Sequence, residues 1–294
     1  MRAPEFKRDV KILISLAYYT MRAVFRYSLR LAGRRSAQRL TILYYHGVSP
    51  EHRRSFARQV EALNRRAWIL PASYRGQLPS GKKCVAITFD DAFVSVAENA
   101  LPELARYSFH STIFVPVGWT GRTPGWAMEE SEPALAVAAN PELTEVVMSS
   151  AQLNALNASL VSLGSHSLTH PPITRLDTQW ARKEIEDSRR RLAELSGREI
   201  IDFSFPYGDH DASAVAMCRA AGYETAYSVT AQEVDTTCPE LLRGRTKVEP
   251  SDGPIEFFLK FNGAYQWMGD SVPLRKTMRS IFGNQAPGIR VQPH

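Results

Sequence analysis

Two short sequence patterns carry side chains that could bind a metal ion and activate water. The first is Thr-Phe-Asp-Asp at 88–91, and the second is His-Ser-Leu-Thr-His at 166–170. Two histidines four residues apart can project to the same side of one helical turn. With one carboxylate they make a set of three ligands that leaves coordination positions open for water and substrate. The two patterns together predict a hydrolytic metal centre held by Asp91, His166 and His170.

The two adjacent aspartates are expected to have different roles. Asp91 as a ligand leaves Asp90 to act as a base toward water on the metal. A bound metal lowers the pKa of such a water to about 7, so a carboxylate is a sufficient base. Each pattern alone also has an ordinary structural interpretation, because paired aspartates after a strand often cap a helix. Their combination at the ends of strands favours a catalytic site.

The elements that position these side chains alternate along the chain from residue 40. Helices are expected at 56–66, 94–107, 178–196 and 212–221. Strands are expected at 40–45, 84–89, 110–117, 161–165, 200–205, 225–229 and 241–248. Strands that alternate with helices predict a parallel sheet. About seven of them predict an α/β fold, a distorted (β/α) barrel, in which active residues gather where strands end.

The chain divides by charge into a basic helical arm, residues 1–39, and a barrel, residues 40–294, with an insertion at 118–150. The first 40 residues hold ten Lys or Arg and two acidic residues, so this segment has a charge of +8. The whole chain has a net charge of +6, so the remaining residues carry −2. The remainder is slightly acidic, which argues against a nucleic-acid partner. Arg22, Arg26 and Arg30 recur every four residues. This spacing predicts a basic amphipathic helix, either lying on an anionic membrane surface or packed on the barrel with a solvated basic face.

The sequence leaves the location of the protein open between cytoplasmic and membrane-associated. The apolar run at 12–21 is shorter than the roughly 20 residues of a membrane span, and Arg22 interrupts it. No clear cleavable signal peptide follows it, and an uncleaved anchor is a further alternative. The three cysteines are far apart, which excludes a Cys-x-x-Cys zinc or redox motif.

The two patterns, together with Phe-Ser-Phe-Pro-Tyr-Gly at 203–208, resemble the polysaccharide deacetylase family, also called the NodB-homology group or carbohydrate esterase family 4. The resemblance implies a distorted (β/α) barrel and a divalent metal, usually zinc, although cobalt, nickel and iron suit the same ligands. By motif, it implies that Asp90 is the base and that Tyr207 supplies a backbone N–H to the oxyanion. The same three metal ligands, Asp91, His166 and His170, follow from it.

The chain departs from the family pattern at Ser204, where an arginine that orients the base aspartate is usual. Arg243 or Arg245, on the last expected strand, could replace that arginine, or both could be surface charges.

A second departure concerns the general acid, which the family usually provides as a histidine late in the chain. Only His294 follows His210 here, and it is the last residue. His46 ends the first expected strand, and in a barrel the first and last strands are neighbours. The chain therefore resembles a branch with the acid histidine on an early strand. We expect His46 to protonate the leaving amine; the alternative is a histidine packed against Tyr44 and Tyr45.

The function that follows is a metal-dependent deacetylase acting on N-acetylated oligo- or polysaccharide, from a bacterial surface or exopolysaccharide. One alternative is hydrolysis of another amide or an O-acetyl ester on the same barrel. The other is a non-catalytic carbohydrate-binding barrel, which has no need for a complete metal-ligand set.

Overall fold

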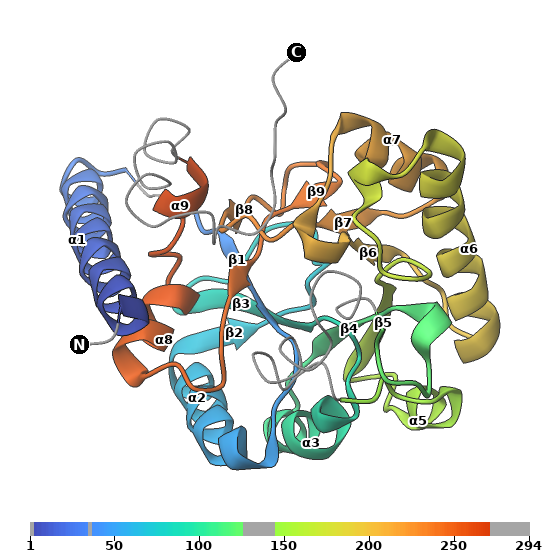
Figure 1. Cartoon of the computed structure of the whole chain (residues 1–294). Helices are drawn as coiled ribbons and strands as arrows, with labels where there is room; N and C mark the ends of the chain where they lie inside the picture. The colour runs from blue at the N-terminus through green and yellow to red at the C-terminus, as the bar shows by residue number, and fades with distance from the viewer. Residues whose placement is uncertain (1–2, 35–36, 126–144, 271–294) are drawn as a thin grey trace.

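The computed structural model describes residues 3–34, 37–125 and 145–270, and its centre is a curved, nearly closed sheet (Figure 1). The strands follow the order β10-β1-β3-β4-β5-β6-β7-β9, and every neighbouring pair on this path is parallel. They are β1 (Leu40–Tyr45), β3 (Lys83–Phe89), β4 (Ser111–Val115), β5 (Val161–Ser165), β6 (Asp202–Ser204), β7 (Thr225–Tyr227), β9 (Leu242–Arg243) and β10 (Thr246–Lys247). The sheet is the distorted (β/α) barrel that the sequence predicts.

The two strands at the ends of this path are consecutive in the chain. Only Gly244 and Arg245 separate β9 from β10. β10 pairs with β1, with Leu43 opposite Thr246, so the first and last strands are neighbours as expected. A Cβ at position 244 would lie 2.4 Å from the carbonyl oxygen of Thr230, so this turn requires glycine. The turn places Arg245 at the seam of the barrel.

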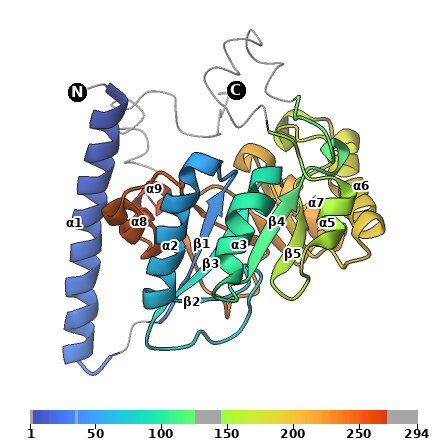
Figure 2. The ribbon, with the colours of Figure 1, turned by 90° about the horizontal axis from the view of Figure 1, so that it is seen from below.

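Helices cover the outside of the sheet (Figures 1 and 2). They include α2 (Arg53–Arg66), α3 (Leu101–Ala105), α5 (Ser150–Ala155), α6 (Thr178–Ser196), α7 (Ala212–Ala220), α8 (Pro254–Phe261) and α9 (Trp267–Asp270). The bounds of α6 follow from its capping residues: the Asp177 side chain accepts the N–H of Trp180, and Gly197 ends the helix at a φ of 63°. Because helices cover one face and side chains fill the interior, β1 is buried along its whole length.

Each strand range expected from the sequence overlaps an observed strand, and the last range, 241–248, is split into β9 and β10. Two further short strands, β2 (Ala67–Ile69) and β8 (Glu233–Val234), pair with β3 and β1. Such short strands carry too few side chains to give a recognisable alternating pattern. The helix expected at 94–107 is a π-helical turn, Val96–Ala100, followed by α3. Of the expected insertion at 118–150, residues 126–144 lie outside the described residues.

Helix α1 (Ala3–Leu31) precedes the barrel and lies alongside it, in contact with α8 (Figure 2). Arg22 forms an ion pair with Glu233 and donates to the Gly263 carbonyl, so this part of the expected basic face contacts the barrel. Arg8 binds Glu256 at 2.6 Å. Within the described ranges, no helix has the length and apolar character needed to cross a membrane.

Candidate metal centre and active site

The polar side chains singled out in the sequence follow the carboxyl ends of neighbouring strands. Asp90 and Asp91 come directly after β3, and His166 comes directly after β5. His46 follows β1, and Tyr207 lies on a short 3-10 turn, Pro206–Gly208, after β6. Because parallel strands end at the same rim of a barrel, these residues lie at one end of the molecule.

Strained backbone is concentrated at this rim. Five of the six described non-glycine residues with positive φ belong to it; they are Asp91, Ala92, Ser167, His170 and Tyr207. A left-handed conformation costs an ordinary residue about 1–3 kcal/mol and persists only where the surrounding structure enforces it. The surrounding structure therefore holds the backbone of these loops in strained conformations, as is common at functional sites.

Asp91, His166 and His170 form a buried cluster with the geometry of a metal-ligand set. Their ligand atoms all lie within 4.8 Å of one another. Asp91 Oδ1 is 3.7 Å from His166 Nε2 and 3.4 Å from His170 Nε2. All three side chains are buried. One carboxylate and two imidazole nitrogens around a common point are a donor set that suits zinc, cobalt, nickel or iron.

The protonation states of the two histidines fit metal binding. Burial lowers the pKa of His166, and it lowers the pKa of His170 to well below the usual value. Both rings are therefore neutral at neutral pH, as ligation requires. His166 Nδ1 donates to the carbonyl oxygen of Ser204 at 2.7 Å, which leaves the lone pair on Nε2, the atom that faces Asp91. The residues present thus fit a divalent cation.

Asp90 is held by Arg245 in a buried bidentate ion pair. Nη1 and Nη2 of Arg245 donate to the two carboxylate oxygens at 2.7 and 2.8 Å. Arg245 Nη2 also donates to Ser204 Oγ at 2.8 Å. Burial alone would raise the pKa of Asp90, but Arg245 and His166 outweigh burial and lower that pKa to about 2. Asp90 is therefore a carboxylate at neutral pH, beside the candidate metal ligands.

The guanidinium of Arg245 is fixed on every side. It lies 4.7 Å from the centre of the Tyr44 ring and 5.3 Å from that of Phe114, distances typical of cation–π contacts. Its Nε donates to the carbonyl of Ser228. Of the two arginines considered as replacements at position 204, the structure brings only Arg245 to Asp90. Arg243 instead binds the carbonyls of Ala72 and Tyr74.

His46 lies at the same rim, within electrostatic range of Asp90 and His166. Its ring packs edge-on against Tyr44, with centroids 5.8 Å apart. Its Nδ1 is buried and has no hydrogen-bond partner among the described residues. Burial lowers the pKa of His46 to about 4, although Asp90 acts in the opposite direction. The imidazole is therefore neutral at neutral pH in the structure.

Tyr207 borders the histidines with both its ring and its backbone. Its ring contacts the His170 ring edge-on, with centroids 4.8 Å apart, and remains substantially exposed. Its φ of 57° places Tyr207 in the left-handed region, which a non-glycine residue rarely adopts. The following Gly208 cannot carry a side chain, because a Cβ would lie 2.3 Å from Val229 Cγ2. The turn thus depends on the left-handed Tyr207 and on the absence of a side chain at Gly208, which packs against Val229.

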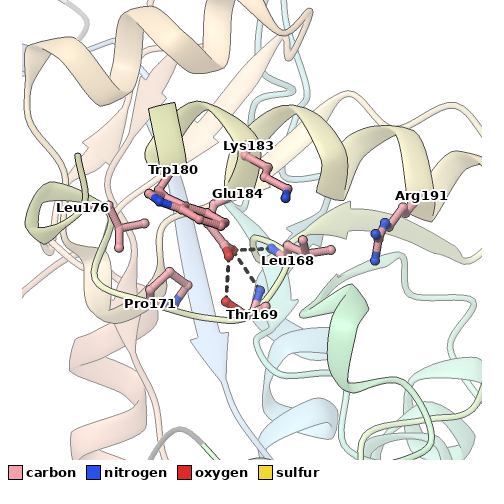
Figure 3. Close-up of a pocket in the computed structure, with 8 residues that line it drawn as sticks. All are labelled: Leu168, Thr169, Pro171, Leu176, Trp180, Lys183, Glu184 and Arg191. Atoms are coloured by element: carbon pink, nitrogen blue, oxygen red, sulfur yellow. Dashed lines mark hydrogen bonds between the residues drawn. The ribbon is translucent and has the colours of Figure 1, made fainter. Parts of the chain in front are cut away.

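One residue that the sequence did not single out supports the histidine loop. Glu184 of α6 accepts the N–H groups of Leu168 and Thr169, both at 2.8 Å, and the Thr169 hydroxyl at 2.6 Å. Figure 3 shows this carboxylate pointing from α6 into the loop, beside a pocket of about 330 Å³. In the sequence, Glu184 is one of many charged residues of a polar helix, so no local signal distinguishes it.

The comparisons with known proteins identify the family and the fold. The family model described as Polysaccharide deacetylase matches residues 77–226, about half of the chain. The Bacillus subtilis (strain 168) protein named "Putative polysaccharide deacetylase YxkH" is 24% identical over 199 residues. That match covers 63% of this chain and 63% of YxkH, so the chain spans less than two thirds of this relative's length.

Solved structures show the same fold. IcaB from Ammonifex degensii has a TM-score of 0.62 at 21% identity, covering 78% of this chain and 98% of IcaB. The Streptococcus pyogenes deacetylase PplD, in complex with acetate, has a TM-score of 0.60 at 18% identity, covering 77% and 99%. Since the family model matches about half of the chain, the chain belongs to the polysaccharide deacetylase family, and the matched range contains Asp90 and the three clustered residues.

Proposed function

We propose that the protein is a metal-dependent hydrolase that removes N-acetyl groups from amino sugars of a bacterial surface polysaccharide or exopolysaccharide. The observation that carries the proposal is the adjacency of an ionised, immobilised Asp90 to the cluster of Asp91, His166 and His170. A base beside a set of three ligands with open positions is what hydrolysis of an unreactive amide requires. PplD, which shares the fold, is described with acetate, the product that this reaction would release.

The roles of the residues follow from their positions. Asp91, His166 and His170 would hold the cation, which supplies Lewis-acid polarisation and lowers the pKa of a water. Asp90 accepts the proton of the attacking water, and Arg245 keeps the carboxylate oriented while it does so. The backbone N–H of Tyr207 stabilises the oxyanion; one such donor contributes about 3–4 kcal/mol in well-studied hydrolases.

His46 is assigned the transfer of a proton to the nitrogen that leaves. Because its low pKa leaves the ring neutral at rest, the proton that His46 delivers is the one that Asp90 takes from the attacking water, so the ring is charged only during turnover. Negative charge that develops on the substrate beside the ring raises the pKa of an imidazole and favours its protonation. The buried Nδ1 has no hydrogen-bond partner among the described residues, so no hydrogen bond at this nitrogen restricts the tautomer of the ring.

The proposal is tested by measuring acetate release from oligomers of N-acetylated amino sugars after the protein has been stripped with a chelator and reloaded with zinc, cobalt, nickel or iron. Activity that depends on metal and on the N-acetyl group is the expected result. Release from O-acetylated sugars alone would replace it with the ester alternative. Sugar binding by the metal-loaded protein without any acetate release would instead indicate a carbohydrate-binding barrel.

A further inference from the structure

One face of helix α1 packs against the barrel. Arg8, Ser15, Tyr19 and Arg22 recur at intervals of seven, four and three residues, so they lie on one stripe of the helix. Ser15 accepts from the Trp267 indole at 2.9 Å, and the Tyr19 ring packs edge-on against Phe258 at 5.4 Å. The ion pairs of Arg8 and Arg22 extend this contact along the helix. These contacts fix α1 against the barrel from Arg8 to Arg22.

The opposite face of α1 is mainly apolar, with Asp9 and Thr20 among its exposed side chains, and the described residues do not cover it. Eight of the thirteen exposed large hydrophobic side chains that the structure describes belong to this one helix. Phe6, Leu13, Val24 and Leu31 are between 56% and 73% exposed. Phe6, Leu13 and Val24 each lie two positions, or about 200° around the helix, from a residue of the docked stripe. We call these four residues and their exposed neighbours on α1 the outer face.

We propose that the outer face of α1 binds the surface of an anionic membrane, with the helix lying in the plane of the interface and the barrel held against it. An exposed apolar patch that follows one face of a helix marks an interaction site. α1 contains six Lys or Arg against two acidic residues, a net charge of +4. Of these, Lys7 and Arg30 lie near opposite borders of the outer face. An apolar face bordered by basic residues is the composition of helices that bind at lipid interfaces.

A second copy of the chain is a poorer occupant of this face. Two α1 helices packed together would bring +4 against +4, whereas an anionic bilayer has the complementary charge. The 29 residues of α1 give a helix about 43 Å long and roughly 10 Å wide, so its outer face offers about 400 Å². A stable protein interface needs about 800 Å² from each partner. A lipid surface has no such requirement, because the whole length of the outer face can lie on it and the barrel itself need not contact lipid.

The proposal predicts co-flotation of the full chain with vesicles that contain phosphatidylglycerol and phosphatidylcholine. Binding should be weaker to phosphatidylcholine alone, and weaker at high salt, where charges are screened. The variant Leu13→Gln with Val24→Gln removes two apolar side chains of the outer face and no contact with the barrel. It should bind the anionic vesicles at least about tenfold less well. The control Ile255→Gln, an equally exposed apolar residue of α8, should bind as the native chain does.

Two readouts separate this inference from its rivals. Acetate release from a soluble substrate should be the same in the native chain and both variants, because neither helix face contributes to the catalytic rim. Native-like vesicle binding by the double variant, or no binding by the native chain, would overturn the proposal. Sedimentation that shows a native dimer, absent in the double variant, without vesicle binding would assign the outer face to a second copy.

Discussion

Arg245 and Asp90 form a two-point ion pair across the barrel, although 155 residues separate them in the chain. Arg245 is fully buried, and Asp90 is nearly so. The pair is possible because the chain turns at Gly244, between the two strands at the ends of the sheet path. Ser204 leaves room for it and contributes a hydroxyl that accepts from Arg245. An arginine from the seam thus takes the place that the family pattern gives to position 204.

Replacing Arg245 should damage stability and activity together. Arg245→Ala leaves a buried carboxylate without its partner, which typically costs about 3–5 kcal/mol. Arg245→Lys keeps the charge but not the planar two-point contact, so it should recover stability better than activity. Urea unfolding and acetate release measure the two effects. An alanine variant as stable and active as the native chain would show that the pair has neither role.

An exchange of positions provides the matched test of the replacement. Ser204→Arg alone places two guanidinium groups near one carboxylate and should destabilise the barrel. Combined with Arg245→Ser, the same change restores one arginine beside Asp90. The double variant should then be more stable and more active than either single variant. If the double variant is no more stable or active than the worse single variant, an arginine at position 204 cannot replace Arg245 in this barrel.

Much of the rim could be predicted from the sequence because it is carried by short patterns at strand ends. Asp90, Asp91, His166 and His170 follow apolar runs, and a parallel sheet brings such positions together. The choice between Arg243 and Arg245 could not be made in the same way. It depends on the break at Gly244, which turns one arginine toward Asp90 and leaves the other on Ala72 and Tyr74.

Whether α1 packs on the barrel could not be decided from the sequence, for a different reason. The stripe that faces the barrel is largely polar, as Arg8, Ser15 and Arg22 show, and its partners are acidic or aromatic side chains distant in the sequence. The helical period was recognisable, but periodicity alone does not say which face is covered. The role of Glu184 could not be predicted either, because the pattern of a helix does not show which loop its side chains contact. Its three hydrogen bonds come from Leu168 and Thr169 of the histidine loop.

The two adjacent aspartates should respond differently to substitution. Asp91→Ala removes a ligand atom from the cluster, so we expect metal binding and activity to be lost together. Asp90→Asn keeps the size of the side chain and leaves the ligand set intact, so metal should remain while activity falls. Metal content of the purified variants and acetate release distinguish these outcomes. Equal loss of metal from both variants would contradict the separation of roles.

Glu184 should affect metal affinity without touching the metal. Glu184→Ala leaves the buried N–H of Leu168 without its acceptor, at a cost of about 1–3 kcal/mol, and also removes the acceptor of the part-buried N–H of Thr169. The loop that carries His170 then loses its anchor, and zinc affinity should fall about 10- to 100-fold, as for other supporting residues. Competition with a coloured chelator measures this. The control is Glu186→Ala, which removes only an exposed ion pair of the same helix; equal affinities of the two variants would refute the role.

Asp202 should make the barrel less stable as the pH rises. Burial raises its pKa to about 6, although a hydrogen bond from Tyr227 and the charge of Arg243 act in the opposite direction. Below about pH 4 the carboxyl is protonated in both folded and unfolded chains, so it has no effect. Between about pH 4 and 6 the unfolded chain releases this proton first, which favours unfolding by roughly 3 kcal/mol at most.

Asp202→Asn removes this titration and keeps an oxygen for the Tyr227 hydroxyl, which donates to Asp202 at 2.9 Å. The variant should therefore exceed the native chain in stability above about pH 6, and the difference should vanish below about pH 4. Urea unfolding across this range provides the measurement. A difference that does not change with pH would show that the carboxyl is not the group responsible.

His46 should be needed for the amide more than for an ester. An amine leaves poorly unless it is protonated, whereas an alcohol leaves more readily, so loss of the proton donor affects the two substrates unequally. His46→Ala should keep its metal and fold, because His46 is not one of the clustered ligands. Removing a general acid typically lowers the rate about 10²- to 10⁴-fold. We expect that loss in kcat on an N-acetyl substrate, and a smaller loss on the matching O-acetyl ester. Equal losses on both substrates would indicate that His46 only shapes the rim, and native turnover on the amide would exclude it as the acid.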